Sequence, residues 1–161
     1  MKRVPKKRTT VVKAPRRTTR GGSKRSVFRQ KGVSRGRRGK AQLKYIPWAS
    51  VELEQLNPLL QRQFIVGHDI MVARVLLKKG YIVPEHSHAN EQVTYILEGA
   101  LKFRIAGREI VVRAGEVLTI PPNMPHEAEA MADTVDLDVF NPPRADWVNK
   151  EDSYLRAATR V

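Results

Sequence analysis

The sequence predicts an all-β protein, a sandwich or barrel of short antiparallel strands, preceded by a basic segment without regular structure. Two observations carry this prediction. From residue 62 onward, short runs rich in β-branched and aromatic residues alternate with glycine or proline, a pattern typical of strands joined by tight turns. The 161-residue chain also changes its charge abruptly near residue 40.

The charge divides the chain into two regions. Residues 1–40 contain 17 of the 30 Lys and Arg residues and no Asp or Glu. Residues 41–161 hold the other 13 basic residues (30 − 17) and all 16 acidic ones, a formal balance of 13 − 16 = −3. With so few apolar side chains, residues 1–40 cannot offset their chain entropy. We therefore expect a disordered basic tail (1–40) and one folded domain (41–161), whose motif-bearing part spans about 70–141.

Three interpretations of the tail remain open. It is a solvated extension or a misassigned start, because no Met occurs between Met1 and Met71. Alternatively, residues 1–40 make nonspecific contact with nucleic acid, since clustered Lys and Arg release counterions from phosphates. The third interpretation is an organellar transit peptide, which is also Arg-rich and poor in acidic residues.

Composition also excludes several classes of site. The chain has no cysteine, so it has no disulfide framework and no thiolate ligands, and a metal must be held by His, carboxylate or amide groups. No apolar run reaches the roughly 20 residues that a membrane span needs, and the N-terminus lacks the apolar core of a secretory signal. We expect a cytoplasmic protein without a membrane segment.

The alternation of apolar and polar residues predicts the elements in order. Residues 41–57 form a lead-in strand or turn packed on the outside of the barrel, and Ala106-Gly107 forms a hairpin turn. Residues 144–158 form a short helix that covers one barrel edge. We expect strands over residues 63–66, 70–76, 93–97, 101–105, 109–113, 117–120 and 135–139.

Three of the four histidines stand in two spaced patterns: Gly80-x5-His86-x-His88-x3-Gln92-x6-Gly99, followed by Gly115-x5-Pro121-x4-His126. Side chains two residues apart on a strand point to the same face, so His86 and His88 can reach one point inside a barrel. Gln92 shares their parity, and His126 can complete the set from a later strand. The spacing predicts a metal site, and the fourth histidine, His68, is expected in a surface turn.

These spacings resemble the paired motifs of the cupin superfamily, in which two histidines, a carboxylate or amide, and a third histidine hold a metal. The resemblance implies a double-stranded β-helix, or jelly-roll barrel, with metal ligands His86, His88, Gln92 and His126. Gln92 stands where cupins commonly have Glu, and Asn123 stands where they usually have Gly. An uncharged shell of three imidazoles and an amide suits one divalent transition metal ion, Ni, Zn, Mn, Fe or Cu.

The segment from Asp138 to Arg144 resembles the Asp-x-Phe-x-Pro-x-Arg motif of small cupins of pectin degradation. These act on 4,5-unsaturated monouronates and promote their conversion to linear keto sugars. The resemblance implies catalytic roles for Asp138 and Arg144, a substrate-binding role for Phe140, and a substrate carboxylate held by Arg144. From the residues alone, Asp138 may equally end a strand, Phe140 may belong to the core and Arg144 may cap a helix.

Two other functions stay open beside this sugar-acid enzyme. One is a non-catalytic cupin that binds a small ligand, and the other is an oxygen-activating iron cupin such as a dioxygenase. Barrels of this type often pair through exposed strands, so a homodimer is expected.

Overall fold

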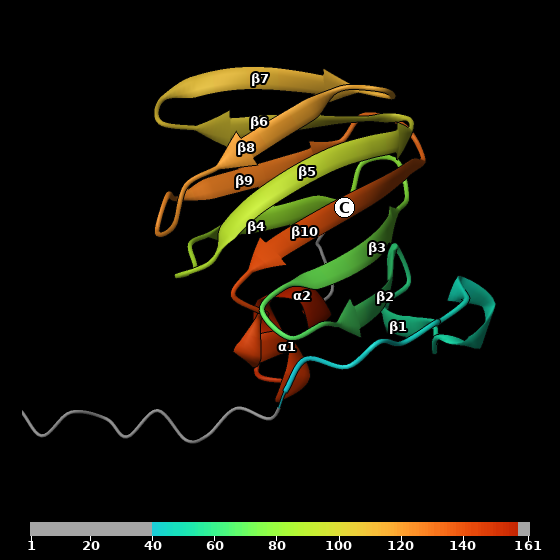
Figure 1. Ribbon diagram of the computed structural model, residues 1–161. Helices are drawn as coiled ribbons and strands as arrows, with labels where there is room; N and C mark the ends of the chain where they lie inside the picture. Colours follow the sequence, from blue (N-terminus) through green and yellow to red (C-terminus); the bar gives the residue numbers. More distant parts are fainter. Residues whose placement is uncertain (1–39, 158–161) are drawn as a thin grey trace, which may run out of the picture. The chain divides into compact units, whose positions relative to one another are not determined.

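The fold is built from two antiparallel β-sheets (Figure 1). The computed structural model describes residues 40–157, so the predicted basic tail (1–40) lies outside the described residues apart from Lys40. The strands are β1 (Glu54–Asn57), β2 (Leu60–Val66), β3 (Met71–Leu77), β4 (Ile82–His86), β5 (Glu91–Glu98), β6 (Ala100–Ile105), β7 (Arg108–Arg113), β8 (Val117–Ile120), β9 (His126–Ala130) and β10 (Thr134–Asn141).

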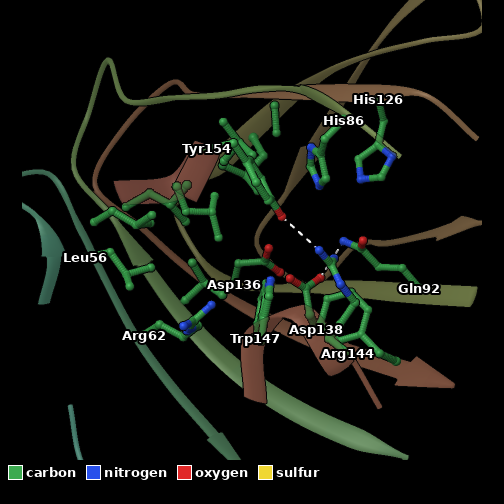
Figure 2. Close-up of a pocket in the computed structure, with 18 of the residues that line it drawn as sticks. Leu56, Arg62, His86, Gln92, His126, Asp136, Asp138, Arg144, Trp147 and Tyr154 are labelled. Carbon is green, nitrogen blue, oxygen red and sulfur yellow. Dashed lines mark hydrogen bonds between the residues drawn. The ribbon is translucent and has the colours of Figure 1, made fainter. Parts of the chain in front are cut away.

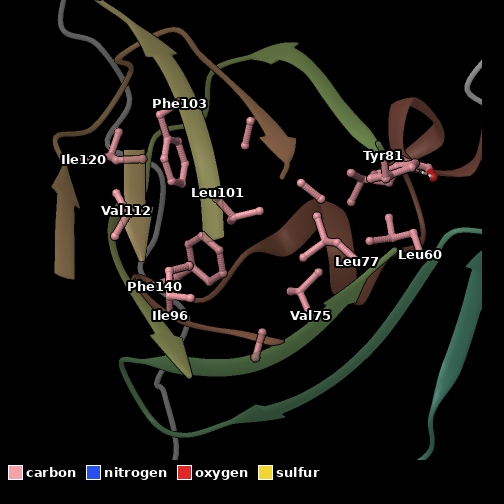
Figure 3. Packing of buried hydrophobic residues seen from close by; sticks show 14 of the residues in the cluster. Leu60, Val75, Leu77, Tyr81, Ile96, Leu101, Phe103, Val112, Ile120 and Phe140 are labelled. Atoms are coloured by element: carbon pink, nitrogen blue, oxygen red, sulfur yellow. Dashed lines mark hydrogen bonds between the residues drawn. The ribbon is translucent and has the colours of Figure 1, made fainter. Parts of the chain in front are cut away.

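The strand order is that of a jelly-roll barrel. One sheet has six strands in the order β1-β2-β3-β10-β5-β8, and the other has four in the order β4-β9-β6-β7. Neighbours in each sheet are far apart in the chain, as when β10 inserts between β3 and β5. Their inner faces enclose one apolar core (Figure 3), which includes Leu60, Leu77, Ile96, Leu101, Phe103 and Ile120. The predicted all-β barrel is confirmed.

Each predicted strand lies within an observed one, but β4 and β9 were not predicted. β9 has the sequence His-Glu-Ala-Glu-Ala, in which Glu and Ala have low strand propensity. Tertiary pairing with β4 and β6 overrides that propensity. The alternation was nonetheless present, since His126, Ala128 and Ala130 are buried while the glutamates between them are half-exposed.

The lead-in segment differs from the prediction. It contains a 3-10 helix (Trp48–Ser50) and the edge strand β1, which pairs with β2. Leu56 is buried in the apolar core, so the expectation that all of residues 41–57 pack outside the barrel was wrong. The alternating faces of β1 explain the difference, because Leu56 points inward where Gln55 is exposed.

Two turns show why particular residues stand where they do. Ala106 and Gly107 both have positive φ, 51° and 71°, as the predicted hairpin turn requires. Gly99 has φ 79°, and a Cβ atom there would lie 2.4 Å from the backbone oxygen of Asp133. Only glycine fits this close approach of two chain segments.

The C-terminal segment forms two short helices, α1 (Ala145–Val148) and α2 (Ser153–Arg156), where one helix was predicted. The chain leaves the helical conformation at Lys150, whose φ is 58°. A buried ion pair between Arg62 and Asp152 at 2.6 Å then ties the start of α2 to β2. The interruption lets Trp147 and Leu155 both enter the core.

Within residues 40–157, no helix has the length and apolar character needed to cross a membrane.

Candidate metal centre

Three histidines meet at one end of the barrel interior. His86 ends β4, His88 lies in the loop that follows, and His126 begins β9. His86 and His126 are direct partners in the ladder between β4 and β9. One ring nitrogen from each of the three residues lies within 4.8 Å of the others. The cluster predicted from spacing is therefore assembled.

Hydrogen bonds select the tautomer of each ring. A carbonyl oxygen can only accept, so an Nδ1 bonded to a carbonyl must carry the proton, which leaves Nε2 with a free lone pair. All three rings follow this rule, each with Nδ1 donating to a carbonyl two residues away: His86 to Pro84 (2.9 Å), His88 to Asn90 (3.0 Å) and His126 to Met124 (2.8 Å). The cluster thus presents three neutral Nε2 ligand atoms.

Gln92 adds a fourth donor atom with its orientation also determined. Its Nε2 donates to Thr94 Oγ1 (2.8 Å) and Asp138 Oδ1 (2.9 Å), so its Oε1 points to His88. Oε1 lies 3.1 Å from His88 Nε2. Both atoms are acceptors in this arrangement, and two lone pairs at this distance are stabilised by a cation between them. His126 Nε2 is buried without a hydrogen-bond partner among the described residues. The donor set therefore fits a divalent transition metal.

The surroundings keep the imidazoles neutral. Burial, followed by the charges of His126 and Arg144, lowers the pKa of His86 to about 3. Burial and Arg144 likewise lower the pKa of His88 to about 4. Burial also lowers the pKa of His126. Since metals bind the unprotonated ring, this environment favours coordination at neutral pH.

The loops that carry the ligands are fixed by backbone hydrogen bonds. Asn123 donates from its backbone N–H to the carbonyl of His88 at 2.7 Å, which joins the turn before β9 to the turn after β4. Asn123 has φ 61°, a left-handed conformation that asparagine tolerates better than most residues. This explains how Asn replaces the glycine that cupins usually have at this position.

One cavity runs from the histidines into the barrel (Figure 2). It has about 530 Å³ of empty space up to its mouth, but only about 50 Å³ is wide enough for the centre of a water molecule. Besides apolar core residues, the cavity is lined by His86, Gln92, His126, Asp136, Asp138, Phe140, Arg144, Trp147 and Tyr154. The structure thus brings Asp138, Phe140 and Arg144 to the same cavity as the metal-ligand cluster.

Asp138 is buried beside a second carboxyl group that the sequence did not single out. Its Oδ1 accepts from Thr94 (2.6 Å) and Gln92 (2.9 Å). Asp136 and Asp138 share a hydrogen bond, and burial together with Asp138 raises the pKa of Asp136 well above its usual value. Burial raises the pKa of Asp138 to about 6 against these hydrogen bonds. The shared parity of Asp136, Asp138 and Phe140 was the available signal for this carboxyl pair.

Arg144 is buried and already bound to protein groups. Its Nε and Nη2 donate to the two carboxylate oxygens of Asp146 at 2.9 and 2.6 Å, and Nη2 also donates to the Tyr154 hydroxyl at 2.9 Å. Nη1 makes no hydrogen bond within residues 40–157. A substrate carboxylate would therefore meet Nη1 or displace Asp146.

Aromatic rings form the wall between Arg144 and the histidines. Phe140 is 1% exposed and makes edge contacts with the rings of His88 (5.6 Å between centroids) and Trp147 (5.1 Å). Tyr154 stacks at a tilt on His86, with centroids 4.7 Å apart. The sequence offered no signal for Tyr154, because it reaches the cavity only through the break between α1 and α2. His68 is in a surface turn, as predicted.

Comparison with known proteins agrees with this architecture. Residues 73–141 match the Cupin_2 family model, described as a cupin domain. The chain belongs to the cupin superfamily. An RmlC-like cupin from Shewanella frigidimarina is 27% identical, with a TM-score of 0.62 over 66% of this chain and 97% of that one. A search of curated proteins found no match.

Two further cupin structures support the fold alone. KdgF from Halomonas sp. is 23% identical, with a TM-score of 0.62 over 66% of this cupin and 99% of KdgF. A variant of Bacillus subtilis oxalate decarboxylase OxdC is 18% identical, with a TM-score of 0.55. That alignment covers 60% of this cupin but 29% of the decarboxylase.

Proposed function

We propose that this cupin is a metal-dependent enzyme that converts 4,5-unsaturated monouronates into linear keto sugars. The observation that carries the proposal is that one cavity is lined by the metal-ligand cluster and by Asp138, Phe140 and Arg144. These three residues match the motif by which the sequence resembles small cupins of pectin degradation. The likeness to KdgF supports the same fold and, at 23% identity, no more.

The metal would be held by Nε2 of His86, His88 and His126 and by Oε1 of Gln92. A divalent ion in this uncharged shell keeps its full positive charge, so it supplies Lewis acidity toward substrate oxygens. Asp138 holds the Gln92 amide through the bond at 2.9 Å. The carboxylate therefore acts on the ligand shell as well as on the substrate.

The reaction is an isomerisation, so protons move but no atom is gained or lost. Opening of the cyclic hemiacetal removes a proton from the anomeric hydroxyl and leaves an enol at C5. Tautomerisation then moves the enol proton to C4 and gives the ketone. Asp138 is the group that moves these protons, because its carboxyl lines the cavity and has a raised pKa near 6. Asp136 shares a hydrogen bond with it and supplies an adjacent protonated carboxyl.

Arg144 and Phe140 bind and orient the sugar acid. The guanidinium offers Nη1 to the substrate carboxylate, while Asp146 and Tyr154 hold its other edge. Phe140 supplies an apolar wall next to His88. Since little of the cavity is wide enough for water, the sugar would occupy the mouth beside the histidines and leave the deep apolar end filled by protein.

The test is the loss of the conjugated absorbance of a 4,5-unsaturated monouronate. Metal-loaded protein should accelerate this loss, whereas protein stripped by a chelator and His88→Ala protein should not. A chain that begins at Ala41 should keep the full rate, because the site lies within the folded domain. Unchanged absorbance with protein of measured metal content would refute the proposal.

A second candidate is a cupin that binds a small anion without converting it. The engagement of Arg144 by Asp146 favours this reading, because a site that must bind and release substrate has one guanidinium edge occupied. Calorimetry with an unsaturated uronate separates the two. Binding without any change in the sugar's absorbance supports the second candidate, and turnover supports the enzyme.

A further inference from the structure

The outer face of the six-stranded sheet is apolar over its central strands. Residues that point outward from β5, β8 and β10 alternate with those that line the cavity. Tyr95, Leu97 and Val117 are exposed, at 38%, 40% and 57%, and Val93, Leu137 and Val139 beside them are half-buried. A contiguous apolar patch on a sheet is typical of an interaction surface.

The outer face of the four-stranded sheet has the opposite character. Lys102 pairs with Glu129 at 2.7 Å, and Arg104 pairs with Glu109 at 3.1 Å and also with Glu127. Such a face is stable in water on its own. The apolar character of the first sheet is therefore a property of that face and not of the whole protein surface.

The register of the strands makes the apolar face self-complementary. Leu137 of β10 lies between Arg74 of β3 and Tyr95 of β5, and Tyr95 is followed by Val117 of β8. These four residues form one row across the sheet. A two-fold axis parallel to β10 exchanges the two sides of such a row. Arg74 would then meet an aromatic ring, and Leu137 would meet its own equivalent.

We propose that the outer face of the six-stranded sheet binds the same face of a second copy of this chain. In this isologous dimer, Leu137 packs on the partner's Leu137, and Arg74 lies over the partner's Tyr95. The basic N-terminal segment is a poor alternative occupant, because residues 1–39 carry 16 Lys and Arg and no acidic residue. An apolar face with Arg74 at its centre offers such a segment no charge complement.

The area is consistent with this occupant. Four strands (β3, β10, β5 and β8) spaced about 4.8 Å apart, each presenting about seven residues at about 3.3 Å, give a flat area of about 440 Å². A standard interface buries about 800 Å² per partner. The extended segment 40–46 lies beside the end of β2 and carries Leu43 and Tyr45, of which Tyr45 is 93% exposed. Together with side-chain relief, these residues supply the additional area.

The first experiment measures the mass of the full chain in solution. Wild-type protein should sediment as a dimer of the 18.3 kDa chain. Tyr95→Lys should weaken dimerisation by at least 100-fold. Val111→Lys is the matched control, because Val111 is half-buried on the other sheet's outer face opposite Lys102. A monomeric wild type, or a Tyr95→Lys protein that dimerises as tightly as wild type, overturns the proposal.

The second experiment does not depend on a destabilising charge. The chain has no cysteine, so Leu137→Cys creates a single thiol. Facing sheets pack about 10 Å apart, a distance that suits a short bismaleimide. Leu137→Cys protein should yield a covalent dimer, whereas Val111→Cys protein should remain a single chain. Equal cross-linking of the two variants, or none for Leu137→Cys, contradicts this interface.

Discussion

The two sheets contribute different chemistry to the same cavity. The four-stranded sheet supplies imidazoles, with His86 at the end of β4 and His126 at the start of β9. The six-stranded sheet supplies an amide from Gln92 on β5 and a carboxyl group from Asp138 on β10. Their outer faces differ as well, since the first carries ion pairs and the second carries apolar side chains.

This difference separates holding a metal from adjusting it. The imidazoles are fixed by backbone carbonyls of their own loops, so their orientation depends little on the opposite sheet. Gln92 instead depends on Thr94 and Asp138, both of the six-stranded sheet. We expect changes to the four-stranded side to remove the metal, and changes to the six-stranded side to alter its affinity or the use of substrate.

The largest expected effect is that of His126→Ala on metal affinity. Structural metal sites contribute about 10–16 kcal/mol shared among four ligands, or roughly 3 kcal/mol for each, which corresponds to a loss of a few hundred-fold. Calorimetric titration with Zn²⁺ or Ni²⁺ measures it. His68→Ala is the matched control, because His68 lies in a surface turn away from the cluster. Equal affinity of His126→Ala and wild type would remove the assignment of the four-stranded sheet as the metal holder.

Arg144→Ala should leave metal affinity within about threefold of wild type and lower kcat/KM for the unsaturated uronate by about 100-fold. Hydrogen bonds to charged groups contribute about 1.5–3 kcal/mol, which sets this magnitude. Asp146→Asn is the companion variant, because it weakens the ion pair at 2.6 Å while keeping the guanidinium. If Asp146 competes with the substrate carboxylate, Asp146→Asn lowers KM. Loss of metal in Arg144→Ala would contradict a role confined to substrate.

Asp138→Asn should weaken metal binding by about 10- to 100-fold, the usual cost of removing a group that orients a metal ligand. The substituted amide can donate toward Gln92 Nε2, which no longer has an acceptor there, so the Gln92 oxygen loses its fixed direction. Asp136→Asn is the control, since Asp136 is equally buried but is not bonded to Gln92. A fall in activity with no change in metal affinity would assign Asp138 to proton movement alone.

The spacing of His86, His88 and His126 predicted the cluster because strand parity and turn length determine where those side chains point. Asp138 and Phe140 followed from the same parity. The ion pair of Arg144 with Asp146 could not be predicted in this way, since it depends on the turn into α1. Tyr154 depends on where α2 begins, which the burial of Asp152 against Arg62 decides. Sequence periodicity describes single strands, and these contacts join segments that lack it.

The smallest expected effect is that of pH on metal affinity. A histidine of ordinary pKa, about 6.5, would be about 97% protonated at pH 5, and three such ligands would lose affinity by more than about 10,000-fold. Here burial lowers the pKa of His86 to about 3 and of His88 to about 4, and also lowers that of His126. The rings are already neutral at pH 5, so the affinity of the folded protein should change less than about threefold between pH 7.5 and 5.

The same shifts act on the stability of the metal-free protein in the opposite sense. Between about pH 6.5 and 3 the unfolded chain binds protons at these histidines that the folded chain does not. Stability therefore rises with pH across this window and is lost as the pH falls. A metal-free protein whose Tm drops from pH 7 to pH 5, while its metal affinity stays flat, would have both properties from one cause. His88→Gln should reduce the drop in Tm, because it removes one of the groups that only the unfolded chain protonates.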